Sequence, residues 1–309
     1  MTENKYASAL DGLTIEDPVE SFFAFCRERE NIRKLRESGE PSPWSEDPIF
    51  QKGRFLNVFR EDDRGSKAIL RFAAGLEDDL PALINAVFFG RWCNRQETLD
   101  LLSPEMLSNP KELEEMLNNI ESWFNETAYP VQPIEWGGKE YSRMDAATKL
   151  FPRIKEELAE IIKNSKGNAI TATNAVNQEF KMENDFPVFM AVIDIAWFRP
   201  DIIEPETDVP TGIGAVAYLD RLEKFLNLND HQETSRKMIE LQKEYWPEAK
   251  RPFNPIDIEY LSCECRKYYS YVNGTKKFEG KNLFKPCLLY TSDAADEGLG
   301  VDLGGRRII

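Results

Sequence analysis

The stretch LFPRIKEELAEIIKN, residues 150–164, shows most directly what kind of fold this chain adopts. Its apolar side chains return every three or four residues, which places them on one face of an α-helix with the charged side chains opposite. The same spacing recurs in PKELEEMLNNIESWF (110–124) and in AVAYLDRLEKFLNL (215–228). Because this period dominates most of the chain, the sequence predicts an all-α fold.

One region departs from the helical pattern. In YPVQPIEWGGKEYS, residues 129–142, the pair Gly137-Gly138 is a turn signal between two short segments that can form strands. The sequence therefore predicts one short β-hairpin beside the helices.

Composition limits the class of protein. The chain has 309 residues and a formal net charge of −15, and no apolar run approaches the roughly 20 residues that a membrane span needs. No signal peptide opens it, and its cysteines are too few for a disulfide framework, which favours a reducing cytoplasm, that of the host if the protein is phage-encoded.

An acidic chain that binds DNA must concentrate basic residues locally. RERENIRKLR (27–36) and RKYYSYVNGTKK (266–277) do so, although ordinary solvated helix faces give the same pattern.

The last residues, Cys287 to Ile309, are similar to a translated transposase-type sequencing adapter and are left out of the fold prediction. We therefore expect an N-terminal lead over residues 1–19, one helical domain over residues 20–286 that is truncated at its C-terminal end, and a non-biological tail over residues 287–309.

A row of polar groups marks the segment RFLNVFREDDR, residues 54–64. If the segment from 54 to 71 is one helix, its polar side chains fall on a single stripe about four turns long. Guanidinium groups present planar donors suited to phosphate oxygens, so the stripe predicts a phosphate-binding face. A solvated stripe held by local ion pairs explains the spacing equally well. The candidate phosphate-binding residues here are Arg54, Asn57, Arg60 and Arg64.

The segment TGIGAVAYLDRL, residues 211–222, is a Gly-x-Gly turn that opens an amphipathic helix. Exposed backbone N–H groups at such a turn bind phosphate, as in helix-hairpin-helix DNA-binding units, which makes Gly212 and Gly214 candidate phosphate ligands. A plain glycine-rich helix entry is the alternative.

A lone carboxylate, Asp194, interrupts the apolar run FMAVIDIAWF, residues 189–198. Burial of an acid raises its pKa, so Asp194 is a candidate general base. The alternative is a structural Asp that pairs with an arginine or caps a helix.

The segment DIEYLSCECRKYY, residues 257–269, places Glu259, Cys263, Arg266 and Lys267 on neighbouring helical turns. Glu264 and Lys267 are candidate catalytic groups. Cys-x-Cys with one histidine in the whole chain, His231, is poor evidence for zinc, so we predict no metal site. No Walker A sequence is present, so this chain carries no P-loop nucleotide site of its own.

Several blocks resemble one family. FFAFCRERENIRKLRESGEPSPWSEDPIFQKGRFLNVFREDDR (22–64) is similar to the opening of DNA-glycosylase-like helical domains from bacteriophage thymine hypermodification. These are the helical domain of 5-hydroxymethyluracil (5-hmdU) DNA kinases and the related alpha-glutamyl/putrescinyl thymine pyrophosphorylases. VFFGRWCNRQETLDLL (87–102), the block from IDIAWF to TGIGAVAYLDRL, and DIEYLSCECRKYY follow in the family's order. The chain departs from it at residues 211–214, where a Gly-Pro-Gly-like turn is expected.

The resemblance implies action on 5-hmdU, or on its pyrophosphorylated form, within double-stranded DNA. In the transferase branch an amino acid or polyamine displaces pyrophosphate. Arg60, Arg64 and Lys267 would then stabilise the leaving group, Asp194 or Glu264 would act as base, and Trp197 or Tyr268 would hold an extruded base. In the kinase branch ATP and Mg²⁺ would act in a P-loop domain beyond the truncation. A non-enzymatic helical DNA-binding or scaffold protein and a DNA glycosylase are the alternatives.

Overall fold

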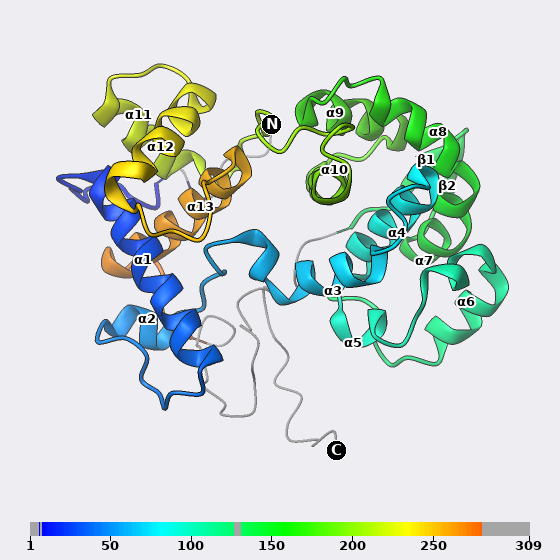
Figure 1. The fold of residues 1–309 in the computed structure, drawn as a ribbon, viewed down its shortest axis with the longest axis horizontal. Coiled ribbons are helices and arrows are strands. Elements are labelled where there is room, and N and C mark those ends of the chain that lie inside the picture. The colour runs from blue at the N-terminus through cyan, green and yellow to red at the C-terminus, as the bar shows by residue number, and fades with distance from the viewer. Residues whose placement is uncertain (1–5, 7, 127–130, 280–309) are drawn as a thin grey trace.

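The computed structural model describes residue 6 and residues 8–126 and 131–279. Figure 1 shows two helical lobes joined near the middle of the molecule. The chain enters the second lobe through residues 53–63 and returns through residues 199–215. The predicted tail, residues 287–309, lies outside the described residues, as does the end of the expected domain.

The terminal lobe combines the first helices with the last, and most of its helices pack around α13. It contains α1 (Pro18–Glu37), α2 (Pro48–Lys52), α11 (Val216–Leu226), α12 (His231–Tyr245) and α13 (Pro255–Val272). Because α1 and α13 come from opposite ends of the chain, this lobe forms only when residues far apart in sequence meet.

The central lobe holds the middle of the chain. It contains α3 (Arg64–Ala73), α4 (Leu80–Cys93), α5 (Gln96–Leu99), α6 (Pro110–Asn118), α7 (Arg143–Asp145), α8 (Phe151–Lys163), α9 (Ala169–Phe180) and α10 (Phe186–Phe198). Short 3-10 turns lie at η1 (Arg60–Asp62) and η2 (Pro104–Ser108), and a π turn, η3 (Ala146–Leu150), leads into α8. Helix α4 is buried on nearly every side and packs against α3, α8 and α10. The all-α prediction is confirmed.

Four of the described helices begin with the same sequence feature, an Asp or Asn followed directly by proline. The acid or amide accepts backbone N–H bonds of the first turn, and proline fits the first helical position because it has no N–H to satisfy. Asp17, for example, accepts from the N–H groups of Val19 and Glu20 at 3.0 and 2.9 Å. The four pairs are Asp17-Pro18, Asp47-Pro48, Asn109-Pro110 and Asn254-Pro255.

The predicted hairpin is present. Strand β1 (Ile134–Trp136) pairs with β2 (Lys139–Tyr141) in antiparallel register, with Ile134 opposite Tyr141. Gly137 and Gly138 form the turn with φ of 59° and 76°, values that L side chains rarely adopt.

The prediction of one helix over residues 54–71 is wrong. Residues 54–59 are not helical, η1 covers residues 60–62, and α3 begins at Arg64. Side chains distant in sequence use the backbone groups that a helix would need. Arg29 donates to the carbonyl of Phe55, and Tyr260 donates to the carbonyl of Val58. The polar stripe therefore does not exist as a continuous surface.

Helix α6 is shorter than the stripe in residues 110–124 predicts. It ends at Asn118, and the Asn119 amide turns back to bond the Glu115 carbonyl at 2.9 Å. Trp123 is still buried, although it lies in a non-helical segment. This segment is held in place by a hydrogen bond from the Asn125 N–H to the Cys93 carbonyl. The apolar residues reach the core by a different backbone path.

Candidate functional site

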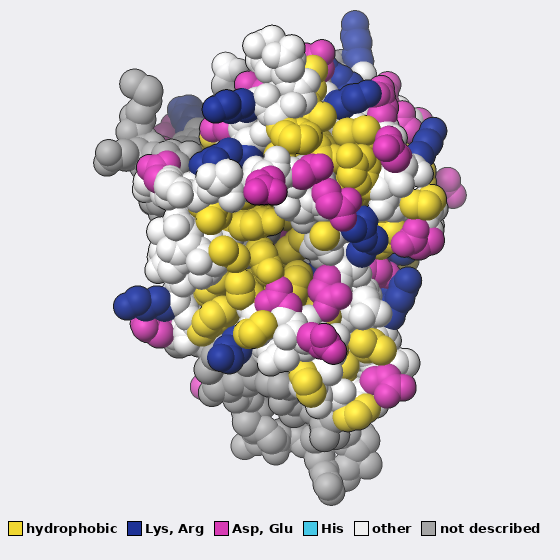
Figure 2. All heavy atoms as spheres, turned by 90° about the vertical axis from the view of Figure 1, so that its left-hand side faces the viewer, with side chains coloured by type: hydrophobic (Ala, Val, Ile, Leu, Met, Phe, Trp, Pro, Cys, Tyr) yellow, Lys and Arg dark blue, Asp and Glu magenta, His cyan; other side chains and the backbone are white. Residues whose placement is uncertain are grey.

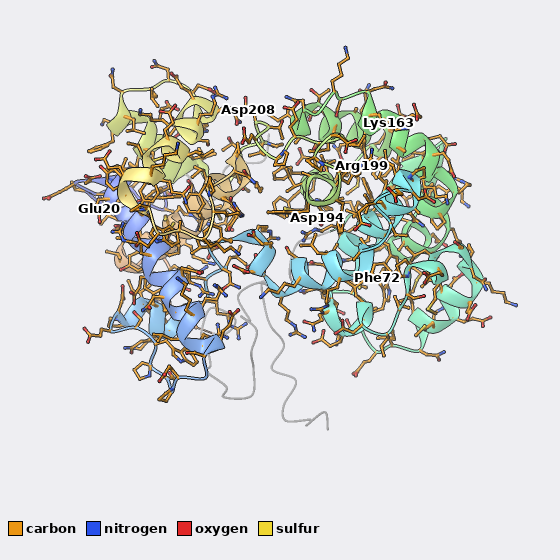
Figure 3. All side chains as sticks on the ribbon, viewed as in Figure 1. Glu20, Phe72, Lys163, Asp194, Arg199 and Asp208 are labelled. Carbon is orange, nitrogen blue, oxygen red and sulfur yellow. The ribbon has the colours of Figure 1, made fainter. Side chains whose placement is uncertain are left out.

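Asp194 lies in a buried ion pair within the central lobe. Its two oxygens accept from Nε and a terminal nitrogen of Arg91 at 2.5 and 2.6 Å, and both residues have no exposed surface. Figure 3 shows Asp194 on the side of α10 that faces α3. Arg91 also donates to the hydroxyl of Ser66 on α3, at 3.3 Å. Since Arg91 engages both oxygens, the structure supports the structural alternative and not the general-base prediction.

The predicted phosphate ligands at residues 54–64 face different neighbours. Asn57 is buried, accepts from Arg29 at 2.7 Å, and fixes the turn through its N–H bond to Asp63. Arg54 is half-buried at the edge of this turn. Arg64 points toward α5, where it bonds Gln96 at 2.9 Å and pairs with Glu97. These residues do not form one phosphate-binding face.

Arg60 turns toward the terminal lobe instead. One terminal nitrogen bonds Asp63 at 2.5 Å, and the guanidinium carbon lies 5.8 Å from the centre of the Tyr260 ring. Its Nε is buried and has no hydrogen-bond acceptor among the described residues. Arg60 therefore holds a donor that the described part of the protein does not use.

The Gly-x-Gly turn packs directly on α13. The Gly212 N–H donates to Oε1 of Glu259 at 2.9 Å, and Arg266 donates to the Gly214 carbonyl at 3.1 Å. A Cβ on Gly212 would lie 2.8 Å from Glu259, and one on Gly214 would lie 2.6 Å from the sulfur of Cys263, so a side chain at either position would force its neighbour on α13 to move. The Gly212 N–H, predicted as a phosphate ligand, thus has a carboxylate of the same chain as its acceptor.

We name Arg60, Gly212 and Glu259 together the junction site. Among these three residues, Glu259 has the most perturbed pKa. Burial raises the pKa of Glu259 to about 7, while the Gly212 N–H and the charge of Arg60 act in the opposite direction. A carboxylic acid with a pKa near neutrality is suited to general acid–base work. Between the two glycines, the side chain of Ile213 is 54% exposed.

Glu264 and Lys267 form an ion pair farther along α13. The Lys267 ammonium lies 2.7 and 2.6 Å from the two carboxylate oxygens, and the Leu56 N–H donates to the same carboxylate at 3.0 Å. Glu264 therefore ties α13 to the segment that leads into the central lobe. Its lone pairs are engaged, which does not favour its predicted role as a base.

Two cations in the C-terminal half of α13 and one that follows the helix influence each other: Arg266, Lys267 and Lys276, named here the α13 cation cluster. Burial and the charges of Lys267 and Arg266 lower the pKa of Lys276 to about 8, with Glu264 opposing. Burial is the largest cause of this downward pKa shift, and the like charges of Lys267 and Arg266 add to it. Such a cluster is suited to an anionic partner.

The two aromatic candidates lie apart. Trp197 on α10 packs under the guanidinium of Arg251, which lies 5.5 Å from its ring and bridges the acids Glu61 and Asp257. This contact joins the two lobes. Tyr268 donates to Asp47 at 2.5 Å and belongs to an aromatic cluster with Phe25 and Phe50, so it supports the terminal lobe.

Charge on the surface is mixed. Figure 2 views the side of α1, α11 and α12, where the described Lys and Arg side chains stand singly among Asp and Glu around an apolar centre. None of the described helices is both long and apolar enough to cross a membrane. Within the described residues, no three His, Cys, Asp or Glu side chains gather to hold a metal ion.

A comparison with protein families bears on the function of the whole chain. The model of the family described as "5-hmdU DNA kinase, helical domain" matches residues 16–277. The chain belongs to this family. Membership supports a part in thymine hypermodification, with DNA that contains 5-hmdU as the partner. Searches of curated proteins and of solved structures give no match.

Within this 5-hmdU DNA kinase helical domain, the predicted candidates omitted Glu259. The spacing of Glu259, Cys263 and Arg266, which are four and three residues apart, does indicate that they share one helical face. That this face meets the Gly-x-Gly turn, 47 residues away, is visible only in the fold.

Proposed function

We propose that this chain binds 5-hmdU in double-stranded DNA and prepares its hydroxymethyl group to accept a phosphoryl group. The base leaves the helical stack and places its hydroxyl at the junction site. Glu259 takes the hydroxyl proton as the oxygen attacks the γ-phosphorus of a nucleoside triphosphate, a new O–P bond forms, and the nucleoside diphosphate leaves. The observation that carries this proposal is the buried Glu259, which has a pKa of about 7 and feels the charge of Arg60. The Nε of Arg60 is itself buried without an acceptor among the described residues.

The donor nucleotide has no place among these residues. The sequence lacks a Walker A loop, and the described side chains offer no trio of metal ligands. These residues do not fit a P-loop site with its metal ion, so in this proposal the triphosphate is held by another module, and no step runs through a metal.

DNA contact is assigned to two features near α13. The α13 cation cluster binds backbone phosphates, and Ile213, exposed between two glycines, inserts beside the extruded base as apolar wedges do in DNA-bending proteins. Both features border the junction site through Arg266, which bonds the Gly214 carbonyl.

Selective DNA binding tests the proposal. In fluorescence anisotropy at fixed salt, a duplex with one 5-hmdU should bind roughly tenfold more tightly than the same duplex with thymine, because one extra buried hydrogen bond contributes about 1–1.5 kcal/mol. Equal affinity would support a scaffold and contradict the proposal. Tighter binding of a duplex that carries the pyrophosphorylated base would favour the amine-transfer reaction. Release of the free base from the duplex would indicate a DNA glycosylase.

A second measurement isolates the phosphate contact. Lys276→Ala should lower the affinity for any duplex and reduce the slope of log K against log[salt] by about one. Because Lys276 loses its proton as pH rises through about 8, wild-type affinity should also fall between pH 7 and 9 by more than that of the variant. Lys163→Ala, on α8, is the matched control. An unchanged salt slope would remove Lys276 from the DNA surface.

A further inference from the structure

Arg251 lies where the two lobes meet the segment through which the chain enters the central lobe, residues 53–63. It belongs to the loop that connects α12 to α13 in the terminal lobe. Its guanidinium carbon is 5.5 Å from the centre of the Trp197 ring on α10, in the central lobe, and 4.8 Å from the centre of the Phe59 ring. One cationic side chain therefore contacts the entering segment and both lobes. Neither the proton transfer nor the DNA contact proposed for this chain uses it.

Arg251 also bridges the entering segment and the start of α13. It donates to the two oxygens of Glu61 at 2.9 and 2.7 Å, and to the two oxygens of Asp257, in the first turn of α13, at 2.6 and 3.1 Å. Asp257 has no exposed surface, and the Glu61 side chain is 21% exposed. The planar guanidinium can engage two carboxylates at once, a geometry that an ammonium group does not reproduce.

The two bridged acids lie next to the junction site in sequence. Glu61 directly follows Arg60 in η1, and Asp257 precedes Glu259 by two residues in α13. Arg60 extends over the same turn of α13, since its guanidinium carbon is 5.8 Å from the centre of the Tyr260 ring. The bridge between the two acids therefore sets where η1, and with it Arg60, lies on α13.

We infer that Arg251 is a positioning residue that holds Arg60 over the turn of α13 that carries Glu259. Through its contact with Trp197, the same side chain makes this placement depend on how the central lobe lies against the terminal lobe. Movement of α10 away from α13 separates the ring from the guanidinium and weakens its hold on η1. The catalytic meaning of this placement rests on the proposed function, whereas the placement itself does not.

The pKa of Glu259 reports the position of the Arg60 charge. Burial raises this pKa to about 7, and the Gly212 N–H and the charge of Arg60 lower it. Cys263, one turn further along α13, is a titratable neighbour whose thiol feels the charge of Glu259. Carboxyl-carbon NMR of the protein labelled at its glutamates measures the pKa, and Glu259→Gln identifies the signal.

Substitutions in pairs test the inference. In the otherwise wild-type protein, Arg60→Gln should raise the pKa of Glu259 by at least about 0.5 unit, because an opposite charge is lost. Glu61→Gln and Trp197→Leu each remove one contact of Arg251. In either background, Arg60→Gln should shift the pKa by less than half as much, because Arg60 no longer keeps its position over α13.

Two matched controls change the same residue types elsewhere. Glu160→Gln on α8 and Trp136→Leu on β1 should leave the full effect of Arg60→Gln on the pKa. Global loosening of the protein would reduce the effect in the controls as well, and this would overturn the specific role of Arg251.

The inference is overturned if Arg60→Gln has its full effect in both Glu61→Gln and Trp197→Leu, or if it has no effect in the otherwise wild-type protein. A reduced effect in Glu61→Gln with a full effect in Trp197→Leu would overturn the dependence on the central lobe. These titrations need no DNA. Equal affinity for thymine and 5-hmdU duplexes would therefore contradict the proposed function and leave the role of Arg251 standing.

Discussion

Asp194→Ala should lower the free energy of unfolding by roughly 3–5 kcal/mol, the largest effect that we expect from a single substitution in the central lobe. The variant leaves the Arg91 guanidinium buried at 0% exposure without the carboxylate that it meets at 2.5 and 2.6 Å. An uncompensated buried charge costs far more than the pair contributes. Denaturant unfolding followed by circular dichroism measures the change.

A double substitution separates stability from chemistry at this position. Arg91→Met with Asp194→Leu removes both charges and should recover most of the lost stability, because apolar groups of similar size replace a buried pair at little cost. Its affinity for 5-hmdU duplexes should match that of the wild type. If Asp194→Ala unfolds like the wild type yet fails to act on DNA, the carboxylate has a catalytic role after all.

The helical content was predictable because its signals are local. Amphipathic spacing and Asp-Pro or Asn-Pro starts lie within a few residues of the helices that they define, as at Asp17-Pro18, and a glycine pair marked the hairpin turn. The error at residues 54–59 has the opposite cause. There the backbone carbonyls of Phe55 and Val58 bond Arg29 and Tyr260, and partners so distant in sequence leave no local pattern.

The site was predictable only in part, for the same reason. Periodicity correctly placed Glu259 on an α-helix but wrongly placed Arg60 on one, and it did not show which residues either of them meets. Asp194 looked like a base because its arginine partner is 103 residues away. The Gly-x-Gly turn was predicted to present its N–H groups to a phosphate, but in the structure the Gly212 N–H donates to an acidic side chain. The anion is Glu259, which comes from the same chain.

Glu259→Gln should change the pH dependence of stability by roughly 3 kcal/mol. The pKa of Glu259 is raised from 4.5 to about 7 in the folded protein, and each pKa unit corresponds to about 1.4 kcal/mol. Between pH 4.5 and 7 the unfolded chain has lost this proton while the folded protein still holds it. Raising the pH over this window therefore destabilises the wild type, and the loss is complete above pH 7.

Glutamine cannot ionise, but its carbonyl can still accept from the Gly212 N–H, so the variant keeps the contact and loses the titration. The difference in unfolding free energy between variant and wild type should rise steadily in favour of Gln from pH 4.5 to 7 and then level off. Glu157→Gln, exposed on α8, controls for the loss of one negative charge. A difference that stays flat across this range would mean that Glu259 is already ionised below pH 5. It would then have no proton affinity near neutrality, and the proposal that it accepts the hydroxyl proton of 5-hmdU would lose its chemical basis.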